Sequence, residues 1–205
     1  MLSVDQRLPA PGGPEVALTF DDGPHGQGTV AVLEALESAS AKATFFLVGE
    51  QVELRPRLAA EIGDAGHAIG LHGYRHHNQL RLTPGQLAAD LERGAAAIAD
   101  ATGRRPDLYR PPYGIFSPAG LALLRRRGYA PLLWSKWGRD WSSRATPESI
   151  TESLTTGVAP GDVLLLHDAD FYSAQGSWRS TAAALPRILQ QLARLGLRPV
   201  TAAVA

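Results

Sequence analysis

Short apolar stretches alternate with helical patterns along almost the whole chain, and this alternation constrains the fold more than any other feature. Strands that alternate with helices pair in parallel, because each helix carries the chain back across the sheet. The sequence therefore predicts one α/β domain with about seven parallel strands, built either as a (β/α) barrel or as an open doubly wound sheet. The predicted strands are Val16–Phe20, Ala43–Val48, Ala68–Leu71, Leu108–Arg110, Tyr129–Trp134, Val163–Leu166 and Leu197–Ala202.

The helices between these strands have clear start and stop signals. A hydroxyl residue precedes a proline at Thr83, Ser117 and Thr146, an order typical of helix N-termini, where the side-chain oxygen accepts a backbone N–H. Residues 1–14 contain three prolines and are predicted to be an irregular lead-in to a domain that spans 15–205. Four glycines follow helical stretches and can take the left-handed conformation that ends a helix: Gly66, Gly103, Gly128 and Gly196.

Charge and composition exclude several classes of function. Twenty Lys and Arg residues balance twenty Asp and Glu residues, so no excess charge favours nucleic acid or an anionic membrane. The longest apolar stretches, such as Val163–Leu166, are far too short to span a bilayer. The start of the sequence has no recognisable signal peptide, and no compartment is predicted. Because there is no cysteine, any metal site must use histidine and carboxylate ligands.

Unusual polar residues follow the predicted strands. In parallel α/β folds the carboxyl ends of the strands form one rim, where binding and catalytic groups collect. We therefore expect these residues to form a single site. The clusters are Asp21-Asp22, His72 with His76, Arg110 with the turn 111–114, Asp140-Trp141 and His167-Asp168.

His72 and His76 are four residues apart, a spacing that lets both imidazoles reach one metal ion from a helical turn or a tight loop. One added carboxylate would complete a shell of two histidines and one acid, with open positions for water and substrate. Such a shell suits a catalytic zinc ion and also other divalent transition metals. The alternative is a polar loop whose histidines bind nearby backbone groups.

The same residues resemble those of a known family. Five motifs occur in the order of the polysaccharide deacetylases, the NodB-homology enzymes of carbohydrate esterase family four, and they span about residues 15 to 202. This resemblance implies a distorted (β/α) barrel and a metal-dependent hydrolase. It would remove N-acetyl groups from N-acetylglucosamine-containing saccharides, such as chitin oligosaccharides or peptidoglycan, and release acetate. The motifs are Thr19-Phe20-Asp21-Asp22-Gly23-Pro24, His72-x-x-x-His76, Arg110-Pro111-Pro112-Tyr113-Gly114, Asp140-Trp141 and Leu164-Leu165-Leu166-His167-Asp168.

The resemblance also implies a role for each matching residue. Asp22, His72 and His76 match the ligands of one divalent metal ion, with Zn²⁺ expected and Co²⁺, Ni²⁺ or Mn²⁺ as alternatives. Asp21 matches the catalytic base. The remaining matches are His167 as general acid, Asp140 as the partner that orients and charges it, Arg110 as the arginine that holds the acidic groups, Tyr113 as the backbone donor to the oxyanion, and Trp141 and Leu165 as the apolar lining around the acetyl methyl.

Two positions depart from the family pattern. Gly73 stands where the family usually has Ser or Thr after the first histidine, so a hydroxyl that would brace the metal loop is missing. Trp137 stands where the fourth motif usually has an additional Asp, which makes that part of the site more apolar. Neither change affects the expected ligands, base or acid, so we expect activity to survive.

The stretch 169–180 runs from the expected acid to the last helix and should overhang the rim. We expect Tyr172 and Trp178 in it to contact a sugar, the alternative being a loop whose aromatic residues pack on one another. His25, just past the first motif, could also reach the rim. Asp168 is expected to brace the loop after His167.

Two further functions stay open at this point. The same scaffold could hydrolyse another amide or ester, because a fold and a metal site do not fix the substrate. A catalytically silent carbohydrate-binding protein could also keep the barrel. The other substrate could be an ester-acetylated polysaccharide or a small N-acyl metabolite. For the N-deacetylase we expect an N-acetylated saccharide as the substrate, no nucleic acid, no membrane span and a monomer.

Overall fold

Strand β1 (Glu15–Asp21) lies at the centre of the sheet and is buried along almost its whole length. The structure is a computed structural model that describes residues 4–9 and 13–202. In it β1 pairs in parallel with β7 (Val163–His167) on one side. On the other side β2 (Thr44–Leu47) lies beside its carboxyl half and β8 (Arg198–Val200) beside its amino half. The continuous apolar sequence of β1 follows from this central position, because both faces are covered.

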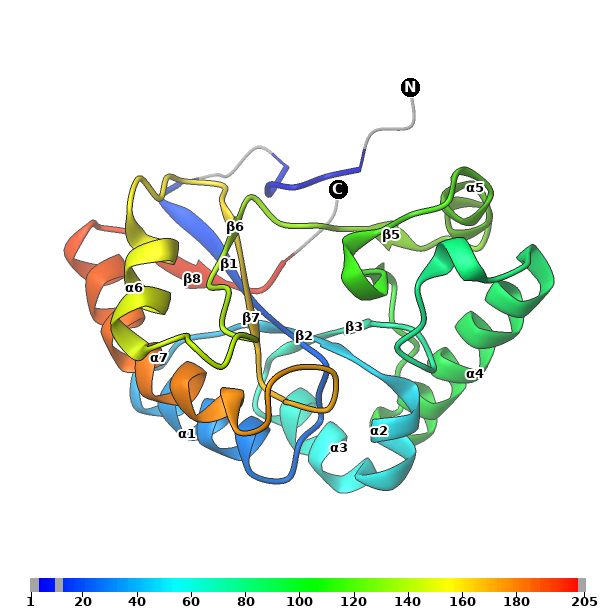
Figure 1. Ribbon diagram of the computed structural model, residues 1–205, viewed down its shortest axis with the longest axis horizontal. Helices are drawn as coiled ribbons and strands as arrows, with labels where there is room; N and C mark the ends of the chain where they lie inside the picture. Colours follow the sequence, from blue (N-terminus) through cyan, green and yellow to red (C-terminus); the bar gives the residue numbers. More distant parts are fainter. Residues whose placement is uncertain (1–3, 10–12, 203–205) are drawn as a thin grey trace.

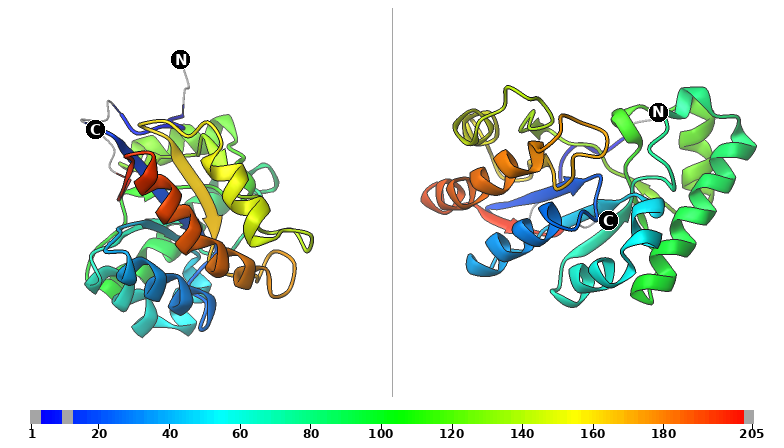
Figure 2. Two further views of the ribbon diagram at one scale, coloured as in Figure 1. Left: turned by 90° about the vertical axis from the view of Figure 1, so that its left-hand side faces the viewer. Right: turned by 60° about the horizontal axis from the view of Figure 1, so that its bottom comes forward.

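The sheet curves but does not close into a complete barrel (Figures 1 and 2). Beyond β2 lie β3 (Ala68–Leu71), β4 (Leu108–Tyr109) and β5 (Ala130–Pro131), and beyond β7 lies β6 (Lys136–Trp137). β5 and β6 are consecutive in the chain, yet they form the two opposite edges of the sheet. The predicted single α/β domain with a distorted (β/α) barrel is confirmed.

Four predicted strands are shorter in the structure, and Tyr129–Trp134 is shortened most. Of Tyr129–Trp134, only Ala130–Pro131 pair as β5, and the chain then crosses the open side of the barrel to β6, which was not predicted. Pro131 has no N–H to donate, which is why it is found on an edge strand. The order of the other predicted strands along the chain is the same in the structure.

Residues 4–9 cross the gap between the two sides of the sheet. Asp5 pairs with Leu132 next to β5, and Arg7 pairs with Asp162 just before β7. The Arg7 guanidinium lies 2.8 Å from the Asp162 carboxylate, which is almost fully buried. Leu8 packs against the smaller of the two apolar clusters of the core. Part of the predicted lead-in therefore covers the open side of the barrel, whereas residues 1–3 and 10–12 lie outside the described residues.

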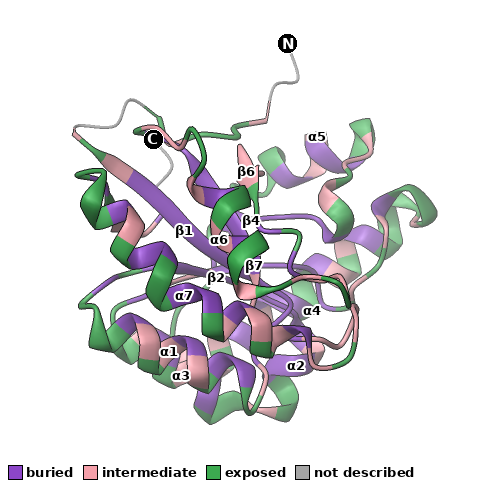
Figure 3. Ribbon diagram, turned by 60° about the vertical axis from the view of Figure 1, so that its left-hand side comes forward, coloured by how far each residue is buried: buried purple, intermediate pink, exposed green. Residues whose placement is uncertain are grey.

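Helices surround the curved sheet, with their inner faces buried and their outer faces exposed (Figure 3). The predicted start signals act as expected, because the hydroxyls of Thr83, Ser117 and Thr146 each accept a backbone N–H of the first turn. No described helix is long and apolar enough to cross a membrane. The helices are α1 (Gly28–Ser38), α2 (Gly49–Leu54), α3 (Pro56–Asp64), α4 (Pro84–Thr102), α5 (Pro118–Arg126), α6 (Pro147–Thr155) and α7 (Ser177–Arg194).

Helices α2 and α4 approach each other closely at two glycines, and this contact holds the loop that follows β3. A Cβ atom on Gly49 would lie 2.8 Å from the Cα of Gly94, and a Cβ atom on Gly94 would lie 3.0 Å from the backbone nitrogen of Tyr74. The Gly49 N–H donates to the carbonyl of Gly73 at 2.9 Å. The chain can reach this carbonyl only because neither glycine has a side chain.

We expect Gly94→Ala to lower the free energy of unfolding by about 1–3 kcal/mol, because backbone atoms must move to admit the methyl group. Gly85→Ala in the first turn of the same helix is the matched control. Nothing lies within 4 Å of its new methyl group, so it should leave stability unchanged or raise it slightly. Urea unfolding followed by circular dichroism measures both, and equal stabilities for the two variants would contradict the proposed tight contact.

Candidate metal and catalytic site

A cavity of about 330 Å³ lies at the carboxyl ends of the strands. Arg110 and Asp140 lie behind its wall and bind residues that line it, whereas Trp178 lies elsewhere. The structure therefore brings together most of the side chains that the sequence assigned to one site. The predicted residues that line the cavity are Asp21, Asp22, His72, His76, Tyr113, Trp141, Leu165, His167 and Tyr172.

Both carboxylates of the first motif face this cavity, although neighbouring side chains on a strand normally point to opposite faces. Asp21 is the last residue of β1 and pairs with His167 at the end of β7. Asp22 follows with a φ of 82°, in the left-handed region, which turns its side chain back toward the rim. Among residues other than glycine, Asp and Asn accept this conformation most readily.

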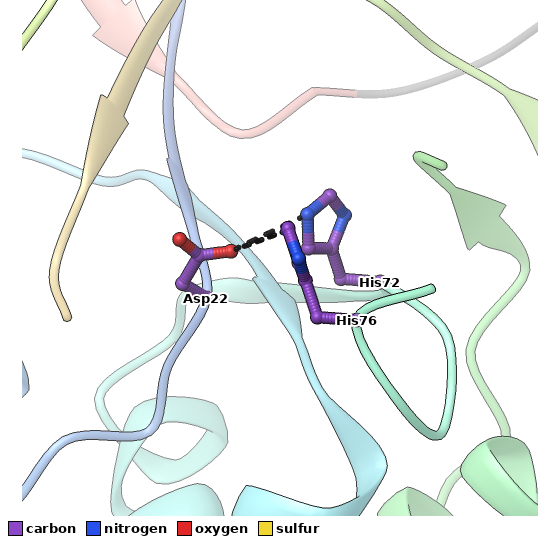
Figure 4. Close-up of side chains that lie close together, drawn as sticks. All are labelled: Asp22, His72 and His76. Carbon is purple, nitrogen blue, oxygen red and sulfur yellow. Dashed lines mark ion pairs between the residues drawn. The ribbon is translucent and has the colours of Figure 1, made fainter. Parts of the chain in front are cut away.

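Asp22, His72 and His76 converge on one point at the edge of the cavity (Figure 4). The Oδ1 atom of Asp22 lies 3.5 Å from Nε2 of His72 and 3.3 Å from Nε2 of His76. One donor atom from each residue lies within 4.8 Å of the other two. All three side chains are at least nine-tenths buried.

The protonation of His72 shows that these atoms suit a metal ion. Its Nδ1 lies 2.8 Å from the carbonyl of Arg110, and a carbonyl only accepts hydrogen bonds, so this nitrogen carries the proton. In the neutral ring Nε2 then directs a lone pair toward Asp22, as second-shell hydrogen bonds commonly arrange for metal ligands. Oδ1 of Asp22 is buried without a hydrogen bond from any described residue. A cation between these acceptors fits the site.

His76 is held neutral and in place by its surroundings. Burial, the largest cause, lowers the pKa of His76 to about 4, and the neighbouring His72 acts in the same direction. Its ring stacks on Tyr172, with centroids 4.2 Å apart and planes 7° from parallel. The Tyr172 hydroxyl in turn donates to Glu50 at 2.9 Å, which fixes the ring that supports the histidine. A neutral imidazole is the form that can bind a metal ion.

Asp21 is paired with a fully buried arginine. Nη1 of Arg110 donates to Oδ1 of Asp21 at 2.7 Å and to the hydroxyl of Thr19 at 2.9 Å. The other oxygen of Asp21 lies 3.8 Å from Nε2 of His72. Asp21 therefore lies beside the three converging side chains while one of its oxygens is held by the arginine.

His167 is held as a charged imidazolium by Asp140. Its Nδ1 lies 2.8 Å from one carboxylate oxygen, and the other oxygen accepts the backbone N–H of His167 and the hydroxyl of Thr181. Burial opposes the charged form, but the Asp140 carboxylate outweighs it and raises the pKa of His167 to about 10. The ring therefore carries a proton at neutral pH.

Comparison with known proteins now decides the family. The family model for polysaccharide deacetylase matches residues 9–132. The chain is a member of the polysaccharide deacetylase family, carbohydrate esterase family 4. Two peptidoglycan-N-acetylglucosamine deacetylases of Bacillus cereus are 34% and 36% identical to it. Each match covers 91% of this chain, and the matches cover 66% and 85% of the relatives.

Other polysaccharide deacetylases differ in substrate and activity. A chitooligosaccharide deacetylase of Azorhizobium caulinodans is 32% identical, over 88% of this chain and 89% of the relative. A solved peptidoglycan N-acetylglucosamine deacetylase superposes with a TM-score of 0.90 at 31% identity, over 97% and 90% of the two chains. A family 4 pseudoenzyme from Bacillus anthracis has a TM-score of 0.86 at 25% identity, over 98% and 68%.

The structure explains the first departure from the family pattern. Gly73 has a φ of 83°, a conformation that strains Ser or Thr. The loop is braced instead by Asp90 of α4, whose two oxygens accept the backbone N–H groups of Tyr74 and Arg75 at 2.9 and 3.1 Å. The sequence analysis missed Asp90. The available signal was a carboxylate next to Leu91 on the apolar face of the helix.

The second departure extends an aromatic wall. Trp137 lies between Trp134 and Trp141, with ring centroids 5.9 and 5.1 Å apart, and Trp141 meets the ring of His167 edge-on at 5.8 Å. Both Trp134 and Trp137 line the cavity, where Trp137 was expected to make the site more apolar and Trp134 was given no role. Trp134 was overlooked because it was expected to be the last residue of a strand, Tyr129–Trp134.

The loop 169–180 is divided between the site and the fold. Tyr172 lines the cavity, but Trp178 packs on Gly28 and His25, so the structure does not bring Trp178 to the site. His25 accepts the backbone N–H of Gly28 at 2.8 Å and starts α1 rather than lining the cavity. Asp168 braces this region from behind, because its carboxylate packs against Gly23 and accepts the hydroxyl of Thr29.

We expect Asp90→Ala to weaken Zn²⁺ binding roughly tenfold or more, because the loop that carries both histidines loses two hydrogen bonds and a support of this kind contributes to metal affinity. Asp100→Ala on an exposed turn of the same helix should bind Zn²⁺ as the wild type does. Isothermal titration calorimetry on folded samples measures both, and unchanged affinity in Asp90→Ala would contradict the bracing role.

We expect Asp140→Asn to lower the pKa of His167 well below about 10, because the main interaction that favours the charged ring is lost while burial still opposes it and only the weaker effects of Asp22 and Asp21 remain. In the wild type the raised pKa means that the ion pair stabilises the fold fully below pH 6.5 and loses this contribution only as the pH rises through about 10. Histidine NMR resonances followed against pH test this, with His67 as an internal reference. Identical titration of His167 in both proteins would contradict it.

Proposed function

We propose that this polysaccharide deacetylase homologue is an active, metal-dependent N-deacetylase of N-acetylglucosamine-containing saccharides. One observation carries the proposal. The buried Oδ1 of Asp22, which accepts no hydrogen bond from a described residue, faces two imidazole nitrogens, and an arginine-bound carboxylate and a charged histidine line the same cavity. Such a cation site with an acid and a base beside it is the arrangement that amide hydrolysis requires.

Asp22, His72 and His76 would hold one divalent ion, for which Zn²⁺ is the first candidate. When bound, this ion supplies a Lewis acid that polarises the amide carbonyl and lowers the pKa of water. Asp21 is assigned as the base that takes the proton of the attacking water. Arg110 keeps one oxygen of Asp21 occupied and orients the other toward the reaction.

His167 is assigned as the general acid, because amide hydrolysis must protonate the leaving amine. Asp140 keeps that proton on the ring at neutral pH. Tyr113 has a left-handed φ of 62° at the cavity wall, and its backbone N–H is proposed to donate to the oxyanion. Trp141 and Leu165 would surround the acetyl methyl group, a small apolar group that suits their side chains.

Two alternatives predict different products. A deacetylase of ester-linked acetyl groups would release acetate from acetylated xylan but not from N-acetylated oligomers. A silent carbohydrate-binding protein, like the pseudoenzyme relative in activity, would release acetate from neither. The side chains proposed as ligands, base and acid all line the cavity, which supports the active enzyme.

The deciding experiment is a panel of substrates with acetate as the readout. N-acetylglucosamine oligomers and acetylated xylan are incubated with protein loaded with Zn²⁺ and with protein treated with a chelator. We expect acetate from the N-acetylated oligomers, loss of this activity with the chelator, and recovery on adding Zn²⁺. Acetate release from oligomers that persists undiminished after the metal is removed would contradict the metal-dependent mechanism.

Variants separate the roles of the two neighbouring carboxylates. Asp21→Asn should lose roughly 10²-fold or more of kcat, the usual contribution of a general base, while still binding Zn²⁺. His76→Ala should lose both activity and metal. Metal content after gel filtration and acetate release measure the two properties, and loss of Zn²⁺ from Asp21→Asn would show that the carboxylates are assigned the wrong way round.

A further inference from the structure

A second groove, of about 660 Å³, adjoins the catalytic cavity. The two share His76 and Tyr113 as lining residues, so a saccharide that extends from the cavity past Tyr113 enters this groove. Tyr113 is 59% exposed and Ile115 is 36% exposed, which leaves apolar surface open beside the site. We call it the Arg81 groove, with His77, Asn78, Arg81, Leu82 and Ile115 as its own lining residues.

The polar side chains of the Arg81 groove are donors, and none of its lining residues is acidic. Arg81 is exposed and forms no ion pair with another residue of the described chain. Asn78 uses its side-chain oxygen to accept the N–H of Leu80 at 3.0 Å, so its NH₂ group is left to donate. An arginine with neighbouring amide and imidazole donors matches the acceptor oxygens of a carboxylate.

Several exposed arginines of the described chain are neutralised by a glutamate, which Arg81 lacks. Arg93, Arg105 and Arg187 each pair with a glutamate within 3.3 Å. Arg75, on the opposite side of His76, lies 3.7 Å from Glu50. The α2 side of the cavity therefore carries a carboxylate, whereas the side beyond Tyr113 carries an uncompensated positive charge.

We propose that the Arg81 groove binds a carboxylate on the sugar next to the N-acetylglucosamine residue in the cavity. This inference rests on the proposed function and adds selectivity to it. The chain would prefer a glycan in which the neighbouring sugar is acidic, as N-acetylmuramic acid is where its lactyl carboxylate carries no stem peptide, over a neutral chitin-like oligomer. Arg81 acts here as a specificity residue that touches the substrate at a distance from the reacting amide.

The test compares substrates of one length that differ in charge. Zn²⁺-loaded protein is given a tetrasaccharide of alternating N-acetylglucosamine and N-acetylmuramic acid, the same compound with its carboxylates converted to methyl amides, and neutral N-acetylchitotetraose. We expect Arg81→Gln to lower the ratio of kcat/KM for the acidic over the neutral oligomer by roughly fivefold, mainly through KM, as loss of an exposed ion pair does. In the wild type, converting the carboxylates of the acidic oligomer to amides should lower this ratio of kcat/KM by the same factor.

Arg57→Gln is the matched control, because Arg57 is also exposed, has no ion pair within the described residues, and lies on α3 away from both cavities. It should leave the ratio unchanged. Equal losses on acidic and neutral oligomers in Arg81→Gln, or no loss on either, would overturn the proposal.

Calorimetric binding of the same oligomers separates this proposal from the proposed function. If the protein releases acetate from none of the oligomers, the proposed deacetylase function is wrong. Tighter binding of the acidic oligomer, lost in Arg81→Gln, would still establish the Arg81 groove. Equal binding of the acidic and neutral oligomers by the wild type would overturn it.

Discussion

The buried side chain of Arg110 makes the interaction on which the site depends most. Its guanidinium binds Asp21 and Thr19 of β1, and its own carbonyl accepts the Nδ1 proton of His72. One residue at the end of β4 therefore orients both the proposed base and a proposed metal ligand. A buried cation must be paired and hydrogen-bonded, so these contacts are also a condition for burying the arginine at all.

The same arginine links the site to the open side of the barrel. Its remaining nitrogens donate to the carbonyls of Leu132 and Leu133 at 3.1 and 2.8 Å, in the segment that leads from β5 toward β6. In the described sheet no strand bridges the gap between the two edge strands, β5 and β6. The Arg110 side chain therefore gives the carbonyls of this segment the hydrogen bonds that a neighbouring strand would otherwise provide. Arg110 thus binds both the irregular segment between β5 and β6 and the buried carboxylate of Asp21.

Three residues other than glycine turn the chain in the left-handed region at the rim, namely Asp22, Tyr113 and Arg139. Each follows the end of a strand, and such conformations cost on the order of 1–3 kcal/mol. The turn at Asp22 lets the consecutive residues Asp21 and Asp22 both face the cavity, and the turn at Tyr113 lets this residue form part of the cavity wall. Around that cavity the rim is uneven, with tryptophans on one side, Glu50 on another and the Arg81 groove on a third.

Much of this protein was determined by the sequence alone. Strand and helix order followed from apolar periodicity and caps, because these signals are local, and the polar clusters could be placed on one rim because parallel strands share an edge. Asp90 and Trp134 could not be given their roles, since each contacts residues that are distant along the chain. Only the tertiary structure decided that the sheet stays open, that Asp90 replaces a missing hydroxyl, and that Trp178 packs on α1 rather than in the cavity. Those outcomes depend on the close approach of several elements at once, which no local pattern of residues encodes.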